Sequence, residues 1–286
     1  MQPNRCAYAR FMSDAALIGP ATAPQLHVMS FNIRRRMTHV TQRSPDLWSH
    51  RRPALRRLFA VECPTIVGVQ EALPDQAAFV KASLTRYHRR IGRGRSAGQR
   101  GEGCPIFFDT RRLQLDHFSQ LALSDTPDIA GSRSWGNRVP RIAMCADFTD
   151  RATGVHFRFI NTHLDHQSRR SRLRAAGFIA DLATETDNPV LVTGDFNSSI
   201  FTGPYDRLVS DGPLVDTWYT AHDRLTESWG SFPNYRAPVA GHKRIDWILT
   251  SPSVTVGATA INPFRHEGIS PSDHLPVSAR VTIANG

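Results

Sequence analysis

Short apolar runs alternate with amphipathic segments along most of the chain. Apolar runs rich in β-branched and aromatic side chains predict buried strands. These strands are expected at 25–33, 65–72, 104–109, 113–123, 141–148, 156–164, 189–197, 244–251 and 274–283. Apolar residues at helical spacing predict helices at 49–62, 74–87 and 167–185. Strands that alternate with helices are typical of an α/β fold.

The helix expected at 167–185 has the clearest periodicity. Its predicted apolar face consists of Leu173, Ala176, Ile179 and Leu182. Residues 92–103 are instead rich in Arg and Gly, a composition that predicts a mobile loop. Because no linker, repeat or low-complexity tract divides the chain, we predict one domain over residues 26–286. A flexible extension rich in Ala and Pro, residues 1–25, is expected to precede it.

Composition adds a basic charge that has two explanations. The formal net charge is +10, which indicates an anionic partner such as nucleic acid, a phosphate ester or an acidic membrane surface. The basic residues are nearly all arginine, however, since Lys81 and Lys243 are the lysines of the chain. A genome whose codon usage favours arginine explains the surplus equally well, so the charge by itself decides nothing.

Cysteine spacing and hydropathy exclude several classes of protein. Cys6, Cys63, Cys104 and Cys145 are scattered without a C-x-x-C pair, so neither a disulfide framework nor a zinc site is indicated. No stretch approaches the ~18 apolar residues of a membrane span, and the first residues lack the apolar core of a signal peptide. We therefore expect a monomeric, cytoplasmic protein without a membrane span.

Polar residues gather where the predicted strands end. They are Asn32, Glu71, His163, Asp195, Asn197 and Asp246. Charged groups are costly to bury unless they are paired or bind a metal. The ligand crevice of an α/β sheet normally lies at strand ends. The pattern therefore predicts one polar site that is assembled from distant parts of the chain.

Each of these residues also has a purely structural interpretation. Asn32 can cap the turn after its strand, and Glu71 can be an acid at a helix start, where the dipole favours it. His163 can be a hydrogen-bonded core histidine, and "GDFN" (194–197) is an Asx-turn sequence. Asp246 can simply pair with the neighbouring arginine. The combination, rather than any single motif, indicates a functional site.

Six motifs, taken in order, resemble those of the endonuclease/exonuclease/phosphatase superfamily. They are "MSFNIR" (29–34), "GVQEA" (68–72), "NTHLDH" (161–166), "TGDFNS" (193–198), "RIDWIL" (244–249) and "PSDHLPV" (271–277). The resemblance runs from residue 26 to about 283. It implies a four-layer α/β sandwich, in which two mixed β-sheets pack face to face with helices outside. Within the superfamily the chain is most similar to an uncharacterised bacterial branch.

The resemblance also implies a divalent metal, Mg²⁺ or Mn²⁺. Glu71 would bind the ion with Asn32 beside it, and Asp246 and Asp273 would be the other acids nearby. Carboxylate and amide oxygens suit these ions better than zinc, which prefers Cys and His. The resemblance, and not the spacing of these residues along the sequence, implies this ligand set.

Catalytic roles follow from the same resemblance. Asp195 would orient or deprotonate the attacking water, and Asn197 would position that water and a phosphate oxygen. His163 and His274 would donate hydrogen bonds to the phosphoryl group. Asp273, directly before His274, would either orient a histidine or bind the metal.

Further candidates for substrate binding lie outside the motifs. Arg34 and Arg141 could each contact phosphate. Trp135 and Arg138 lie in the segment where related nucleases often carry a tyrosine near the phosphate. Glu102 could serve as a leaving-group acid, although a loop glutamate is more often only solvated. With the Arg-rich loops, these residues would form a basic rim with one aromatic surface, suited to a phosphate backbone and a stacked base.

The predicted function is therefore a metal-dependent phosphoesterase. A nuclease or other phosphodiesterase is the first choice by elimination. The chain lacks the "W-x-G/C-D-R" ending of inositol phosphatases, a hydrophobic hairpin like that of sphingomyelinases and the leucine-rich repeats of deadenylases. The alternative is a phosphomonoesterase of sugar, inositol or nucleotide phosphates. A non-catalytic binding module is disfavoured, because no motif position carries an inert residue.

Overall fold

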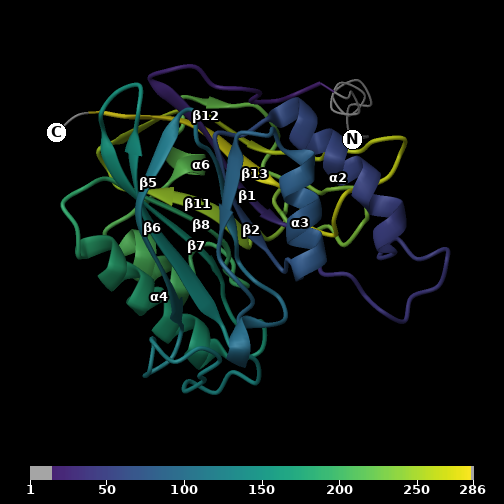
Figure 1. The fold of residues 1–286 in the computed structure, drawn as a ribbon, viewed down its shortest axis with the longest axis horizontal. Helices are drawn as coiled ribbons and strands as arrows, with labels where there is room; N and C mark the ends of the chain where they lie inside the picture. The colour runs from purple at the N-terminus through teal and green to yellow at the C-terminus, as the bar shows by residue number, and fades with distance from the viewer. Residues whose placement is uncertain (1–14, 285–286) are drawn as a thin grey trace.

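The computed structural model describes residues 15–284 and arranges them in four layers. Helices α2 (Trp48–Glu62) and α3 (Pro74–Ser83) cover the outer face of one sheet, and α4 (Arg169–Thr184) covers the outer face of the other (Figure 1). The two sheets pack against each other between these helices. The predicted sandwich of two mixed sheets with outer helices is therefore confirmed.

The first sheet has seven strands in the order β10-β12-β13-β1-β2-β4-β3. Their bounds are β1 (Gln25–Asn32), β2 (Ile66–Gln70), β3 (His88–Ile91), β4 (Ile106–Asp109), β10 (Asp223–Arg224), β12 (Val254–Ile261) and β13 (Val277–Ile283). The central strand β1 is parallel to β2 and antiparallel to β13. Strand β13 therefore begins at the edge of the sheet where β1 and β2 end.

The second sheet has six strands in the order β5-β6-β7-β8-β11-β9. Their bounds are β5 (Leu113–Ala122), β6 (Ile142–Asp150), β7 (His156–His163), β8 (Val190–Asp195), β9 (Val215–Asp216) and β11 (Asp246–Thr250). The parallel pair β7 and β8 ends where the antiparallel strand β11 begins. Short helical turns complete the chain at η1 (Ala97–Gln99), α5 (Gly203–Tyr205), η2 (Asp206–Ser210) and α6 (Thr217–Thr220).

Alternation along the strands divides the apolar residues between the layers. On β1, Val28 faces the other sheet, whereas Met29 packs against α2 and α3. On β8, Leu191 faces the first sheet, whereas Val192 packs against α4. Burial on both faces explains why these strands are continuous apolar runs in the sequence. Within residues 15–284, no helix is long and apolar enough to cross a membrane.

All nine predicted strands and three predicted helices are present, with ends that differ by a few residues. Strands β3 and β12 and the two-residue strands β9 and β10 were not predicted. Strand β3 has the polar sequence HRRI, and it forms at the sheet edge by pairing with β4 rather than through an apolar pattern of its own.

Two details of the prediction are corrected by the structure. Leu173 does not belong to the buried face of α4, because its side chain is 48% exposed. That face consists of Ala175, Ala176, Ile179, Ala180, Leu182 and Ala183. The Arg-rich segment 92–103, predicted as a mobile loop, contains backbone hydrogen bonds and a short helical turn. In it, the Arg95 N–H donates to the Glu102 carbonyl at 2.8 Å, and strand-like bridges join Gly103 to Gly94 and to Ala72.

A polar contact links the sheets in the middle of the sandwich. The buried amide of Asn161 on β7 donates to the Val69 carbonyl at 3.0 Å and accepts from the Gln70 side chain at 2.7 Å. Gly68 is required here, since a Cβ would lie 2.2 Å from Thr193 Oγ1 and 2.5 Å from Asn161 Oδ1. The close approach fixes how the two sheets are placed relative to each other.

The described part of the expected N-terminal extension is attached to the domain. Glu62, at the end of α2, is fully buried, and the backbone N–H groups of residues 17–19 donate to its carboxylate at 2.8 to 3.2 Å. Asn262 donates to the same carboxylate at 2.9 Å. Residues 15–24 are therefore not a loose tail, while residues 1–14 of the predicted extension lie outside the described residues.

We predict that Glu62→Ala lowers the free energy of unfolding by about 2–4 kcal/mol, because it leaves several buried or half-buried donors without an acceptor. Urea denaturation measures the loss, and Glu62→Gln, which keeps the shape and one acceptor oxygen, should lose less. A change for Glu62→Ala of less than about 0.5 kcal/mol, the size of an ordinary surface substitution, would contradict the anchoring role.

Candidate active site

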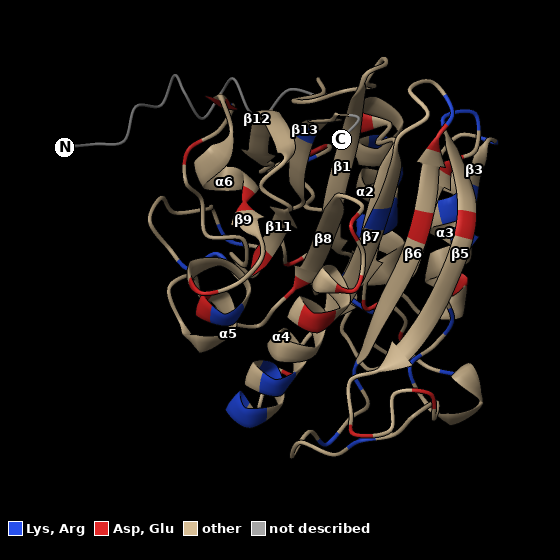
Figure 2. Cartoon of the chain, turned by 90° about the vertical axis from the view of Figure 1, so that its left-hand side faces the viewer, with Lys and Arg blue, Asp and Glu red and all other residues tan. Residues whose placement is uncertain are grey.

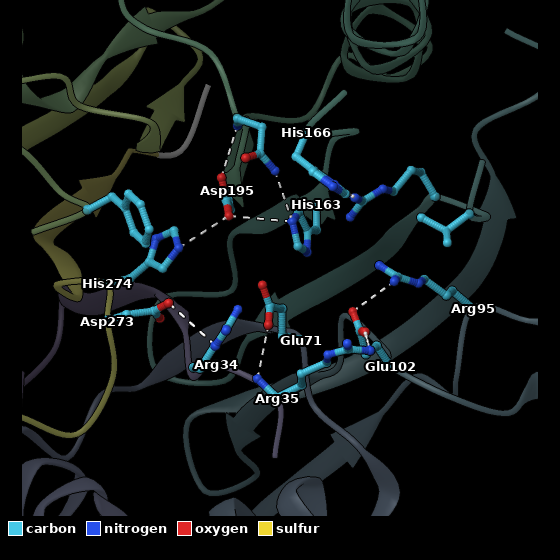
Figure 3. Close-up of a pocket in the computed structure, with 14 residues that line it drawn as sticks. Arg34, Arg35, Glu71, Arg95, Glu102, His163, His166, Asp195, Asp273 and His274 are labelled. Atoms are coloured by element: carbon cyan, nitrogen blue, oxygen red, sulfur yellow. Dashed lines mark hydrogen bonds and ion pairs between the residues drawn. The ribbon is translucent and has the colours of Figure 1, made fainter. Parts of the chain in front are cut away.

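A polar cavity of about 480 Å³ lies where the strand ends of both sheets meet (Figure 3). Asn32, His163 and Asp195 are the last residues of parallel strands, and Glu71 directly follows β2. The antiparallel strand β11 begins at this same edge with Asp246. The topology thus brings together the polar residues that the sequence places at strand ends.

Asn32 lies at the centre of the site. Its fully buried side-chain amide donates to Glu71 Oε1 at 3.1 Å and to Asp195 Oδ2 at 2.9 Å. Its Oδ1 accepts from the Arg34 N–H at 2.9 Å. One amide therefore connects an acid of the first sheet to an acid of the second.

His274 lies between two carboxylates. Its Nδ1 is 2.9 Å from Asp246 Oδ2, and its Nε2 is 3.8 Å from Asp195 Oδ2. Burial lowers the pKa of His274, but the charges of Asp246 and Asp195 outweigh this effect and raise that pKa to about 10. The imidazole is accordingly cationic at neutral pH. Asp246, and not the adjacent Asp273, orients this histidine.

Asp195 is a buried carboxylate with a raised pKa. Burial and the negative charge of Asp246 raise the pKa of Asp195 to about 7, against the opposing effects of His274 and of hydrogen bonds from Asn32 and the Asn197 N–H. The Asn197 N–H donates to Asp195 Oδ1 at 2.9 Å. A buried carboxyl whose pKa lies near 7 suits proton transfer at neutral pH.

His163 is held as a neutral imidazole. Burial, followed by the charges of Arg141 and Arg95, places the pKa of His163 well below its usual value. The Asn197 amide nitrogen donates to the Leu164 carbonyl and to His163 Nε2, each at 3.0 Å. His163 Nε2 also lies 3.4 Å from Asp195 Oδ2, whereas Nδ1 is a buried atom that has no partner within residues 15–284.

The acids near the first sheet have different partners. Glu71 Oε2 accepts from the Arg35 N–H at 3.0 Å. Burial raises the pKa of Glu71, but this hydrogen bond and the one from Asn32 bring it below its usual value. Asp273 is buried, accepts from Ser272 Oγ at 3.1 Å and lies 3.5 Å from Arg34 Nε. Burial raises the pKa of Asp273.

Three residues in the turns around the cavity have a left-handed backbone conformation. Arg34, Glu71 and Asn197 have φ values of 53°, 61° and 48°. Such left-handed conformations are uncommon for residues other than glycine, and they gather at functional sites where the surrounding structure enforces them. Each of these turns follows a strand that ends at the cavity.

Two sets of groups could hold a cation. Ligand atoms of Asp195, Asp246 and His274 lie within 4.8 Å of one another. The second set is Glu71 and Asp273, which line the same cavity, with the Asn32 amide nitrogen 3.1 Å from Glu71 Oε1. Oxygen-rich sets suit Mg²⁺ or Mn²⁺. The second set offers carboxylate oxygens, whereas the first includes an imidazole nitrogen, so the second set fits these ions better.

Arginines and acids alternate around the remaining wall of the cavity. Arg35 Nη1 lies 3.0 Å from Glu102 Oε1, and Arg95 Nη2 lies 2.8 Å from Glu102 Oε2 (Figure 3). Glu102 thus contacts arginines rather than His163, its expected partner as a leaving-group acid. Arg141 Nη2 lies 2.9 Å from His166 Nδ1, and its Nη1 is buried without a partner among the described residues.

Two predicted substrate-binding residues do not line the cavity. Trp135 is 5% exposed, packs in the core beside α4, and donates its indole N–H to Asp125 at 2.8 Å. Arg138 is exposed, and its carbonyl accepts from Arg133. Trp135 therefore does not supply the aromatic surface of the predicted basic rim, because its indole is used for packing.

Lining residues without a predicted role are Arg35, His166, Phe232 and Val139. Arg35 and His166 adjoin motif residues, a position that could have marked them. Phe232 lies in a long loop, its ring is 45% exposed, and its centroid is 4.7 Å from that of His274. No periodicity in the sequence marks this residue, because only the fold brings its loop to the cavity.

Comparison with known proteins agrees with this arrangement. The model of the endonuclease/exonuclease/phosphatase family matches residues 29–274. The chain belongs to this family. Its members are phosphoric ester hydrolases, and the predicted resemblance is confirmed.

Several solved structures and one curated relative of the family are similar to the chain. A mannosyl-6-phosphatase from Bacteroides thetaiotaomicron is 30% identical with a TM-score of 0.79, over 90% of this chain and 99% of that one. A family protein from the same organism is 28% identical with a TM-score of 0.83, over 91% and 95% of the two chains. Drosophila melanogaster Protein angel is 26% identical over 59% of this chain, and the match spans 49% of that protein's length.

The position of Trp135 generates a prediction. Trp135→Phe should change the turnover of a phosphate ester by less than about threefold, because the ring is outside the cavity. It should lower the free energy of unfolding by about 1 kcal/mol through loss of the bond to Asp125. Steady-state kinetics and urea denaturation measure the two effects. A loss of turnover above tenfold in a folded variant would return Trp135 to the substrate site.

Proposed function

We propose that the chain is a divalent-metal-dependent phosphomonoesterase that acts on small hydroxylated phosphate esters, such as sugar phosphates. One observation carries the proposal: the charges that line the cavity are largely paired with one another. The lining contains four arginines and four carboxylates. A site for a polyanion needs surplus positive charge to neutralise successive phosphates.

The pairing leaves little cationic capacity for more than one phosphate. Arg34 is bound by Asp46 at 3.1 Å and lies near Asp273. Arg35 and Arg95 share Glu102. Similarity to the mannosyl-6-phosphatase over nearly the whole of both chains supports the same substrate class. The net charge of +10 therefore does not require a nucleic-acid substrate.

A phosphodiesterase, the first choice from the sequence, is the second candidate. Phe232 favours it, since an exposed ring at the cavity mouth could stack on a base or another flat group. Paired arginines and the burial of Trp135 count against it. The two candidates differ in the substrate that they cleave, which makes them separable by kinetics.

In the proposed mechanism, Glu71 and Asp273 would hold the divalent ion, with Asn32 beside Glu71. When bound, Mg²⁺ or Mn²⁺ supplies positive charge that neutralises the phosphoryl oxygens. Asp195 Oδ2 accepts a proton from the attacking water, and the Asn32 amide and the Asn197 N–H hold that carboxylate in place. As the water oxygen bonds to phosphorus, the bond from phosphorus to the ester oxygen breaks, and the departing alkoxide takes a proton from solvent.

Two histidines stabilise the charge that develops on the phosphoryl group. His274 donates from Nε2, while Asp246 holds its Nδ1 and keeps it cationic. His163 donates from the unpartnered Nδ1, with Asn197 orienting its other nitrogen. Asp246 thus acts through His274 and is a positioning residue rather than a metal ligand.

A substrate panel tests the proposal. With Mg²⁺ or Mn²⁺, kcat/KM for mannose 6-phosphate should exceed that for bis(p-nitrophenyl) phosphate and a single-stranded oligonucleotide by about 100-fold or more. EDTA should abolish turnover, and added Mg²⁺ should restore it. Preferred cleavage of the oligonucleotide would establish the phosphodiesterase instead, and full activity in EDTA would remove the metal.

Two isosteric variants separate the proposed roles. Glu71→Gln should weaken Mg²⁺ binding, measured by calorimetry, by about tenfold or more, since it removes a ligand. Asp195→Asn should lower kcat by about 10²–10⁴-fold even at saturating metal. The control is Glu185→Gln, an exposed acid far from the cavity lining. If either variant behaved like this control, its residue would lose the assigned role.

A further inference from the structure

We infer that Arg35, Glu102 and Arg95, here called the Arg–Glu wall, bind the hydroxyl groups of the substrate and set its specificity. This inference rests on the proposed phosphomonoesterase function and names the part of the site that holds the non-phosphate portion of the substrate. In Figure 3 Glu102 and Arg95 lie on the side of the cavity opposite His274 and Asp273. A phosphate placed at Asp195 and His274 would therefore direct its ester substituent toward the wall.

Two of the three members of the wall, Glu102 and Arg95, are held in place before a substrate binds, whereas the Arg35 side chain is 48% exposed. The Glu102 side chain is 9% exposed and the Arg95 side chain 12%, so neither is a freely moving surface group. Gly103, directly after Glu102, exchanges two backbone hydrogen bonds with Ala72, at 2.9 and 3.2 Å. Ala72 follows Glu71, so the wall is tied to the segment that carries the proposed metal ligand. Preorganised groups lose little entropy when they bind a ligand.

The chemistry of the wall matches hydroxyl groups. A carboxylate has about four lone-pair positions and a guanidinium five N–H donors, so the ion pairs leave acceptors and donors unused. A sugar hydroxyl both donates and accepts, and neighbouring hydroxyls can use both kinds of group. The negative charge of Glu102 neutralises part of the positive charge of the two arginines. The wall is therefore a weaker site for a second phosphate than two unpaired arginines would be.

Arg141 adds a donor beside the wall. Its side chain is 3% exposed and lines the cavity, and Nη1 has no partner among the described residues. A buried N–H left without an acceptor is costly, so a substrate oxygen is the expected partner. Arg141 and Arg95 are both close enough to lower the pKa of His163, after burial itself. Arg141 thus belongs to the region between the wall and the catalytic groups.

The test compares a hydroxylated substrate with one that has no hydroxyl groups. We expect Glu102→Gln to lower the ratio of kcat/KM for mannose 6-phosphate to kcat/KM for phenyl phosphate by about 10-fold or more. Most of the change should be a higher KM for the sugar phosphate. Arg93→Ala is the control, since Arg93 is exposed in the same loop, bonds Gln99 at 2.6 Å and does not line the cavity. Its ratio should stay within twofold.

A second variant guards against misfolding. Arg95→Lys keeps the charge but loses the planar fork, and it should shift the ratio in the same direction. Equal losses on both substrates, or an unchanged ratio in both folded variants, would overturn the inference while leaving the phosphomonoesterase intact. A wild-type protein that hydrolyses neither monoester but cleaves diesters would overturn the proposed function, and the inference with it.

Discussion

The buried amide of Asn32 is the interaction on which the site depends. It is the only group that hydrogen-bonds both Glu71 and Asp195 among the contacts of residues 15–284, and these acids belong to different sheets. Two carboxylates cannot be brought together in a buried place unless donors or cations satisfy them. The face-to-face packing of the sheets sets the distance between the strand ends. The hydrogen bonds of the Asn32 amide stabilise the two buried carboxylates at that distance.

A second buried polar group holds the strained turn beside it. Arg51 is fully buried in α2, and its guanidinium donates to carbonyls of residues 33–35 and to the Pro271 carbonyl. Ser272 then donates to the Asn32 carbonyl at 2.7 Å. These bonds compensate for the left-handed backbone of Arg34 and bring the turn before His274 against the end of β1. The helix thus positions the site without contacting the cavity.

The ion pairs at the cavity, rather than the net charge of the chain, indicate which substrate the site can bind. Basic and acidic residues alternate along much of the chain in Figure 2. At the cavity, Arg34, Arg35 and Arg95 are each bound to a carboxylate, so a net charge of +10 coexists with a site of nearly balanced charge. The same pairing gives Glu102 a role in substrate selection in place of the acid role expected from the sequence.

The order of residues alone predicts the α/β class, nine of the strands and the strand-end positions of four site residues, Asn32, Glu71, His163 and Asp195. Burial on two faces and a polar strand end are both visible in the sequence, although the eight-residue strand β12 was missed. The sequence did not determine which side chains contact one another. Only the tertiary structure assigned Asp246 rather than Asp273 to His274, Glu102 to two arginines and Trp135 to the core. It also formed β3, a polar edge strand, and brought Phe232 to the cavity. The reason is that a side chain's partners are set by sheet register and packing across long sequence separations, which no local pattern records.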